Sequence, residues 1–208
     1  MTKIDHVLLA TTDLRHGEQQ LWLGFGLRCA PGGSHRRWGT ANLIVPIGSQ
    51  YLELVAVEDA QLARTSLLGR AVLAAADRDR LTPIGLCLAT ADLAAVATRL
   101  GQQLEGGSRA LADGTEIRWT SVGMAQAFGT ARLPFFISWE NPAQHPSTAP
   151  SDHRISPRGI AEVEVGGPEP ALLSHLSEAV PGVLAVGGAP GVRSLTLRLD
   201  GGAEVHLP

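Results

Sequence analysis

Short apolar runs, separated by turn-forming residues, dominate the chain. The β-rich run Ile4–Ala10 is followed by Thr11-Thr12-Asp13, which can cap a helix running from Leu14 to the glycines at 24 and 26. The next segments are the extended stretches Leu27–Ala30, Thr40–Ile47 and Tyr51–Val57, with a Gly-rich loop at Pro31–Gly33 and a turn at Gly48-Ser49. The first module of the chain is therefore predicted to be a strand, a helix and three strands, βαβββ.

The same order of elements begins again 79 residues later. Thr90-Ala91-Asp92-Leu93 nearly copies Thr11-Thr12-Asp13-Leu14, and it lies between an extended run, Ile84–Ala89, and a helical stretch, Leu93–Leu100, that ends at Gly101. The second module is completed by the turn Asp113-Gly114 and the extended runs Thr115–Ser121 and Phe135–Trp139. The repeat favours a fold built from duplicated modules.

A third, more compact copy of the pattern is predicted near the end of the chain. Its segments are the strands Ile160–Val165, Val183–Val186, Ser194–Leu199 and Ala203–Leu207 and the helical stretch Ala171–Ala179. We therefore divide the chain into a first module (1–59), a connecting segment (60–81) with a helix at Ala60–Ala76, a second module (82–140), a Pro-rich linker (141–158) and a third module (159–208).

Composition and charge exclude several classes of function. The 17 Lys and Arg against 20 Asp and Glu give a net charge of −3, so no basic surface for a nucleic acid is expected. No apolar run approaches the roughly 18 residues needed to span a bilayer, and no signal peptide precedes the first strand, so we expect a cytoplasmic protein. Cys29 and Cys87 have no metal-binding spacing and are predicted to be buried thiols.

Several segments of the modules carry residues suited to a binding site. They are Ile4-Asp5-His6-Val7, the stretch from His35 to Asn42, Tyr51-Leu52-Glu53-Leu54, Gly107-Ser108-Arg109, Arg118-Trp119 and Leu133-Pro134-Phe135-Phe136-Ile137. With the βαβββ repeat, these segments resemble the vicinal-oxygen-chelate superfamily, and more narrowly its glyoxalase-like branch, over about residues 3–165. The resemblance implies an α+β fold in which tandem βαβββ modules form curled mixed sheets around a central cleft.

The resemblance also implies a divalent metal ion, Zn, Ni, Mn, Co or Fe, held by His6 of the first strand and Glu53 of the fourth. Strand alternation places His6 on one face with Leu8, and Glu53 on one face with Tyr51 and Val55. In the second module, the pattern puts Gly85 opposite His6 and Ser138 opposite Glu53, and neither is a good ligand. Further ligands are expected either from a partner chain or from the third module, where the candidates are Glu162, Glu204 and His206.

Other polar and aromatic residues are candidates for contact with a substrate. The substrate-binding candidates are Trp38, Asn42, Arg118, Trp119, Phe136 and Ser138. Of the two arginines of this region, Arg118 is favoured over Arg109, although a solvated charge ladder with Glu116 explains its strand face equally well. The candidates for a catalytic base are Glu140, Glu162 and Glu204. His35 is interpreted as a surface residue. His145 and His153 lie in the Pro-rich linker, which could fold over the cleft as a lid, but they are interpreted as solvated linker residues.

Two functions agree with these features. The first is a metal-dependent lyase or isomerase; the resemblance implies that a small oxygenated metabolite chelates the ion through two oxygens, giving an enediolate-like intermediate. The second is a metal-free protein that binds or sequesters a small molecule in an apolar pocket lined by Trp38, Trp119 and Phe136. A homodimer is also predicted, because three modules leave one open sheet without an internal partner.

Overall fold

The computed structural model of the chain describes residues 1–111 and 114–207, so Asp113 of the predicted Asp113-Gly114 turn lies outside the described residues. Eight strands form a closed barrel in the order β1-β4-β3-β2-β6-β7-β8-β5. The strands from the first module are β1 (Lys3–Ala10), β2 (Ala30–His35), β3 (Thr40–Ile47) and β4 (Gln50–Val57). Those from the second are β5 (Thr82–Ala89), β6 (Glu105–Ala110), β7 (Glu116–Val122) and β8 (Phe135–Trp139). The predicted curled sheets of two modules are thus confirmed.

The duplication is visible in the pairing of the strands. β1 runs parallel to β4, and β5 runs parallel to β8. The two halves meet where β1 pairs antiparallel with β5 and where Ser34 of β2 pairs with Ala110 of β6. Helix α1 (Leu14–Phe25) is capped by Asp13, and α4 (Leu93–Leu100) is capped by Asp92, so the 79-residue repeat extends to the helix caps.

The segments around the modules differ in part from the prediction. The helix expected at Ala60–Ala76 is two helices, α2 (Ala60–Ala63) and α3 (Leu67–Ala75), because Ser66 starts a new helix by accepting a hydrogen bond from the Gly69 amide. A further short helix, α5 (Met124–Phe128), contacts α3. No helix of the described residues is long and apolar enough to cross a membrane.

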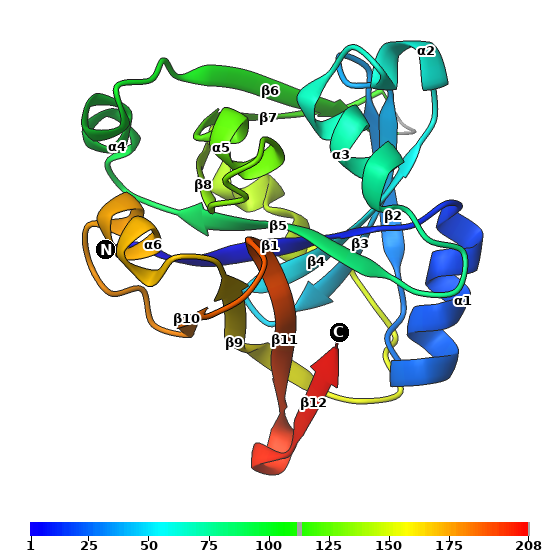
Figure 1. The fold of residues 1–208 in the computed structure, drawn as a ribbon. Coiled ribbons are helices and arrows are strands. Elements are labelled where there is room, and N and C mark those ends of the chain that lie inside the picture. The colour runs from blue at the N-terminus through cyan, green and yellow to red at the C-terminus, as the bar shows by residue number, and fades with distance from the viewer. Residues whose placement is uncertain (112–113, 208) are drawn as a thin grey trace.

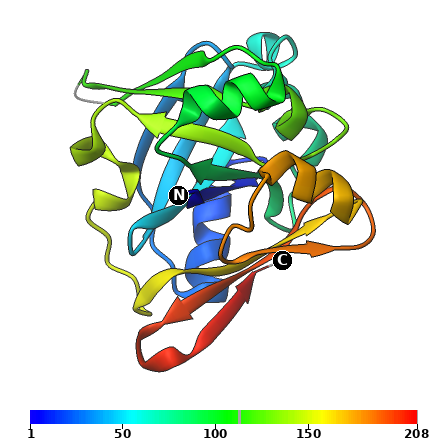
Figure 2. The ribbon, with the colours of Figure 1, turned by 90° about the vertical axis from the view of Figure 1, so that its left-hand side faces the viewer.

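The third module forms a separate four-stranded sheet that lies against the outside of the barrel (Figure 1; Figure 2). Its order is β10-β9-β11-β12, and β11 packs on β5 of the barrel. The elements are β9 (Pro157–Gly166), α6 (Glu169–Leu176), β10 (Val183–Val186), β11 (Gly191–Leu199), the 3₁₀ turn η3 (Asp200–Gly202) and β12 (Glu204–Leu207).

The Pro-rich linker lies along the barrel and holds two 3₁₀ turns, η1 (Pro142–Gln144) and η2 (Pro146–Thr148). The ring of His153 accepts a hydrogen bond from the Arg28 amide at 2.9 Å and contacts the Pro46 carbonyl oxygen at 2.8 Å. The interpretation of His153 as a merely solvated side chain is therefore wrong, since it attaches the linker to two segments of the first module.

Strand alternation separates two hydrophobic cores. On β1, Val7 and Leu9 face outward into a core shared with the outer sheet, whereas His6 and Leu8 face the barrel interior. On β4, Leu52 and Leu54 join the outer core in the same way. The interior of the barrel holds polar residues of these two strands together with aromatic and aliphatic side chains from both modules.

Candidate functional site

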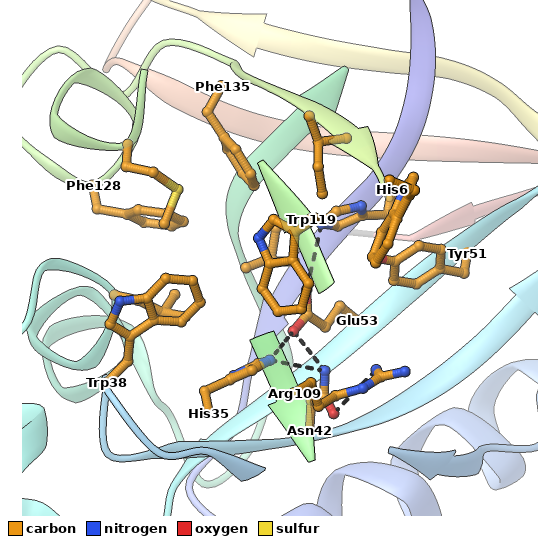
Figure 3. Close-up of a pocket in the computed structure, with 15 residues that line it drawn as sticks. His6, His35, Trp38, Asn42, Tyr51, Glu53, Arg109, Trp119, Phe128 and Phe135 are labelled. Atoms are coloured by element: carbon orange, nitrogen blue, oxygen red, sulfur yellow. Dashed lines mark hydrogen bonds and ion pairs between the residues drawn. The ribbon is translucent and has the colours of Figure 1, made fainter. Parts of the chain in front are cut away.

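The barrel encloses a small cavity with mostly aromatic walls (Figure 3). Its volume is about 30 Å³, enough for one or two water molecules. The lining residues are His6, Leu8, His35, Trp38, Asn42, Tyr51, Glu53, Leu68, Arg109, Trp119, Met124, Phe128, Phe135, Ile137 and Trp139. A ligand larger than water therefore needs some of these side chains to move.

The ring of His6 is held in place by its neighbour Asp5. Its Nδ1 lies 2.7 Å from Asp5 Oδ1, and its ring stacks on Tyr51 with 4.4 Å between the ring centroids. The other Asp5 oxygen accepts a hydrogen bond from Trp139 Nε1 at 3.1 Å and lies 3.2 Å from His145 Nε2. Although burial opposes ionisation, hydrogen bonds with His145 and His6 hold the pKa of the Asp5 carboxyl well below its usual value. Asp5 is therefore a buried carboxylate that orients His6.

Glu53 faces the opposite nitrogen of the same ring, with 3.4 Å between His6 Nε2 and Glu53 Oε2. When His6 donates its Nδ1 proton to Asp5, Nε2 carries a lone pair that points at a carboxylate oxygen. Two acceptors that face each other at this distance are bridged by a proton or by a cation. The predicted convergence of His6 and Glu53 is thus present, with both side chains almost completely buried.

The other Glu53 oxygen is held by two residues of the first module. Asn42 Nδ2 donates a hydrogen bond to Glu53 Oε1 at 2.7 Å, and His35 Nε2 lies 3.5 Å from the same oxygen. His35 is only 2% exposed, so its interpretation as a surface residue is wrong. Burial lowers the pKa of His35, and the carboxylate of Glu53 opposes that shift. The imidazole of His35 is therefore a neutral base at neutral pH.

Arg109, which the sequence ranked below Arg118 as a candidate for contact with a substrate, is also buried. It is 5% exposed, and its Nη1 lies 3.4 Å from Asn42 Oδ1. Asn42 thereby connects the guanidinium on one side with Glu53 on the other. Arg118, the favoured arginine, is instead exposed and paired with Glu116.

The aromatic wall comes from both modules. Trp38 and Trp119 lie with ring centroids 6.1 Å apart, and Trp119 lies 5.5 Å from Trp139 by the same measure. Glycine at position 107 makes room for this wall, because a Cβ there would lie 2.4 Å from the indole of Trp119. Trp38 and Trp119 therefore line the cavity, as the sequence suggested.

His145 of the linker packs against two aromatic residues that line the cavity, Tyr51 and Trp139. Its ring lies 5.6 Å from that of Tyr51 and 5.3 Å from that of Trp139, centroid to centroid, in addition to its contact with Asp5. The interpretation of His145 as a solvated linker residue is wrong. Its neighbours come from distant parts of the chain, so no local signal in the sequence indicated this contact.

The structure does not bring the remaining candidates to the cavity. Phe136 is fully buried on the outward face of β8, where its ring lies 5.5 Å from that of His175. Ser138 and Glu140 are exposed. Glu162, Glu204 and His206 belong to the outer sheet and line none of the cavity.

The register of the strands also changes the comparison between the modules. Leu8 pairs with Glu53, and its counterpart Cys87, 79 residues later, pairs with Phe135. Phe135, not Ser138, therefore occupies the position equivalent to Glu53, and it lines the cavity. The second module still offers no metal ligand at either equivalent position, Gly85 or Phe135.

Among the described residues, one group of three potential metal ligands has all its donor atoms within 4.8 Å of one another. It consists of Asp5, His6 and Cys87, all buried. Burial, followed by the charges of Asp5 and Glu53, raises the pKa of the Cys87 thiol well above its usual value, which disfavours the thiolate that binds metals. Since Asp5 already bonds three side chains, the Nε2 side of His6 is the better place for an ion.

Comparisons with known proteins agree with this architecture. The model of the glyoxalase-like domain matches residues 4–180. A hypothetical protein from Staphylococcus aureus has a similar structure, with a TM-score of 0.65 and 16% identity over 99% of this chain and 85% of that one. A methylmalonyl-CoA epimerase variant from Streptomyces coelicolor, with bound 2-nitronate-propionyl-CoA, gives a TM-score of 0.47 and 19% identity over 66% of this chain and 94% of that one. No curated protein matches.

Proposed function

Because the chain belongs to the glyoxalase-like domain family of the vicinal-oxygen-chelate superfamily, we propose that its barrel cavity is a divalent-metal site acting on a small oxygenated metabolite. The reaction class is that of a lyase or isomerase. The observation that carries the proposal is the facing pair of acceptors, His6 Nε2 and Glu53 Oε2, 3.4 Å apart and buried.

The residues present fit a divalent ion with open coordination positions. His6 and Glu53 would hold it, while Asp5 keeps the His6 ring in the orientation that directs Nε2 at Glu53. An imidazole and a carboxylate suit Zn, Ni, Mn, Co or Fe. When bound, the ion supplies Lewis acidity toward two neighbouring oxygens of a substrate.

The chain's own groups have separate tasks in this site. Asn42 fixes one Glu53 oxygen by its 2.7 Å hydrogen bond, which leaves Oε2 directed at His6. We assign proton transfer to His35, because it is the neutral base that faces the cavity, whereas Glu140, Glu162 and Glu204 lie outside it. The aromatic wall excludes water from the reacting atoms.

A metal-free binding protein is the second candidate function. The observation that favours it is the second module, where Gly85 and Phe135 replace both ligand positions and make that half of the cavity apolar. In this case, a proton takes the place of the cation between His6 and Glu53. The predicted homodimer is compatible with both functions.

Metal analysis of the purified protein separates the two functions. We expect one equivalent of a transition metal in the native protein and its loss in His6→Ala and in Glu53→Ala. The matched controls are His206→Ala and Glu204→Ala, an exposed pair on the outer sheet, which should keep the metal. A native protein that holds no metal and takes up none of the five ions would reject the metal site in favour of metal-free binding.

A further inference from the structure

Arg109 is a buried cation without an anionic partner in the described part of the chain. Its side chain extends from β6 and is 5% exposed. Among residues 1–111 and 114–207, no carboxylate oxygen lies within 4.0 Å of its guanidinium nitrogens. Within the same residues, its side chain makes one hydrogen bond, the 3.4 Å contact with Asn42 Oδ1. A guanidinium has five N–H donors, so most of its bonding capacity is unused.

The neighbouring strand is shaped to admit this side chain. A Cβ at Gly33 would lie 2.8 Å from Arg109 Cγ and 2.1 Å from the Ala110 carbonyl oxygen. A Cβ at Gly32 would lie 2.3 Å from Asn42 Oδ1, the oxygen that Arg109 contacts. The two glycines of β2 thus leave space for Arg109 and Asn42 to lie side by side. Figure 3 shows both side chains next to each other at one end of the cavity.

Arg109 also borders two hollow regions of the molecule. Besides the barrel cavity, it lines a pocket of about 200 Å³ that Ile44, Ile117 and the linker residue His145 also border. A molecule that occupied both regions would therefore contact Arg109. Burying a charge is unfavourable unless it is paired, and a ligand anion would supply the missing partner.

We propose that Arg109 binds the carboxylate of a small organic acid, whose neighbouring oxygens then lie toward His6 and Glu53. This proposal rests on the cavity being the ligand site described above, and it narrows the substrate class from oxygenated metabolites to acids. Arg109 is suited to this role because its planar fork matches the two oxygens of a carboxylate. Arg118 is not, because it is exposed and already paired with Glu116.

The test compares each acid with its amide, which has nearly the same shape and no charge. Formate, acetate, lactate, pyruvate and malonate are titrated against the protein stripped of metal, with binding followed by ligand-observed NMR and by thermal shift. We expect at least one acid to bind about tenfold or more tightly than its amide, as a charged hydrogen bond provides. Arg109→Met should abolish that preference, and Arg118→Met is the matched control that should retain it.

Two results would overturn the proposal: no acid binds better than its amide, or the preference survives in Arg109→Met. If the methionine variant does not fold, Arg109→Lys tests the same contact, because it keeps the charge but loses the two-pronged geometry; the acid should then bind several-fold more weakly. Since the titration uses metal-free protein, it does not depend on the metal site. If metal analysis rejects the metal site but the protein still prefers acids to amides, only the metal proposal fails. If the preference for acids is absent as well, both proposals fail.

Discussion

At the scale of single residues, one position along a strand decides whether a side chain faces the cavity or the outer core. Phe135 lines the cavity, whereas Phe136, the residue favoured from the sequence, packs outward against His175. Two adjacent phenylalanines give no alternation of apolar and polar residues, so the sequence does not show which one faces inward. Glu53 lies between two leucines, and there the face could be predicted.

Gly107 provides a test of packing at this scale. Gly107→Ala should displace the Trp119 indole, because the new Cβ would lie 2.4 Å from the ring, and we expect a loss of about 1–3 kcal/mol in the free energy of unfolding. Gly106→Ala is the matched control on the same strand, since no atom lies within 4 Å of its added Cβ. Chemical denaturation and Trp fluorescence measure both effects. Equal stability of the two variants would contradict the steric role of Gly107.

At the scale of elements, the two helix caps that repeat after 79 residues should act independently. Asp13 accepts a hydrogen bond from the His16 amide at 3.0 Å, and Asp92 accepts one from the Ala95 amide at 2.9 Å. Each substitution by Ala should lower the free energy of unfolding by about 1 kcal/mol, and the double variant by about the sum. Asp152→Ala, in the exposed linker, is the control and should change it by less than about 0.5 kcal/mol. Urea denaturation measures these changes, and a cap variant as stable as the native protein would contradict the predicted role of that cap.

The same elements show what the sequence could predict. Helix Leu93–Leu100 and strand Thr40–Ile47 have the predicted bounds, because local signals, a cap with a terminal glycine or a run bounded by turns, define their ends. The segment Pro31–Gly33 was predicted as a loop but belongs to β2, since its glycines serve close packing against Asn42 and Arg109 rather than a turn. Local signals do not carry that information.

In the candidate site, too, local sequence signals indicate some residues and not others. His6 and Glu53 could be predicted, because each is a polar residue on an apolar strand at a position that matches a known family. Asp5, His35 and His145 could not, and Arg109 could not be ranked above Arg118, because these roles depend on partners from other parts of the chain. His35 reaches Glu53 only after β2 and β4 have been brought together through β3.

At the scale of the whole molecule, the outer sheet completes the hydrophobic core of the barrel. Val163, Leu195 and Leu197 of this sheet belong to one cluster with Val7 and Leu9 of β1. Helix α6 attaches to the second module through His175, whose Nε2 lies 2.7 Å from the Pro134 carbonyl oxygen, and Arg99 bonds the His175 carbonyl oxygen. The third module is therefore packed on the barrel and does not supply the site.

His175 makes this attachment dependent on pH. Burial lowers its pKa in the folded state below the ordinary 6.5, and Arg99 reinforces the shift while the hydrogen bond to Pro134 opposes it. Below pH 6.5 the unfolded chain therefore takes up a proton that the folded chain does not, so stability falls as the pH decreases, by up to about 1.4 kcal/mol per pH unit. His175→Gln removes this proton uptake, so the difference in unfolding free energy between the native protein and the variant should shrink from about pH 8 to pH 5. Urea denaturation across that range measures this difference. If the unfolding free energies of the two proteins change in parallel with pH, His175 titrates alike in the folded and unfolded states, which would contradict the prediction.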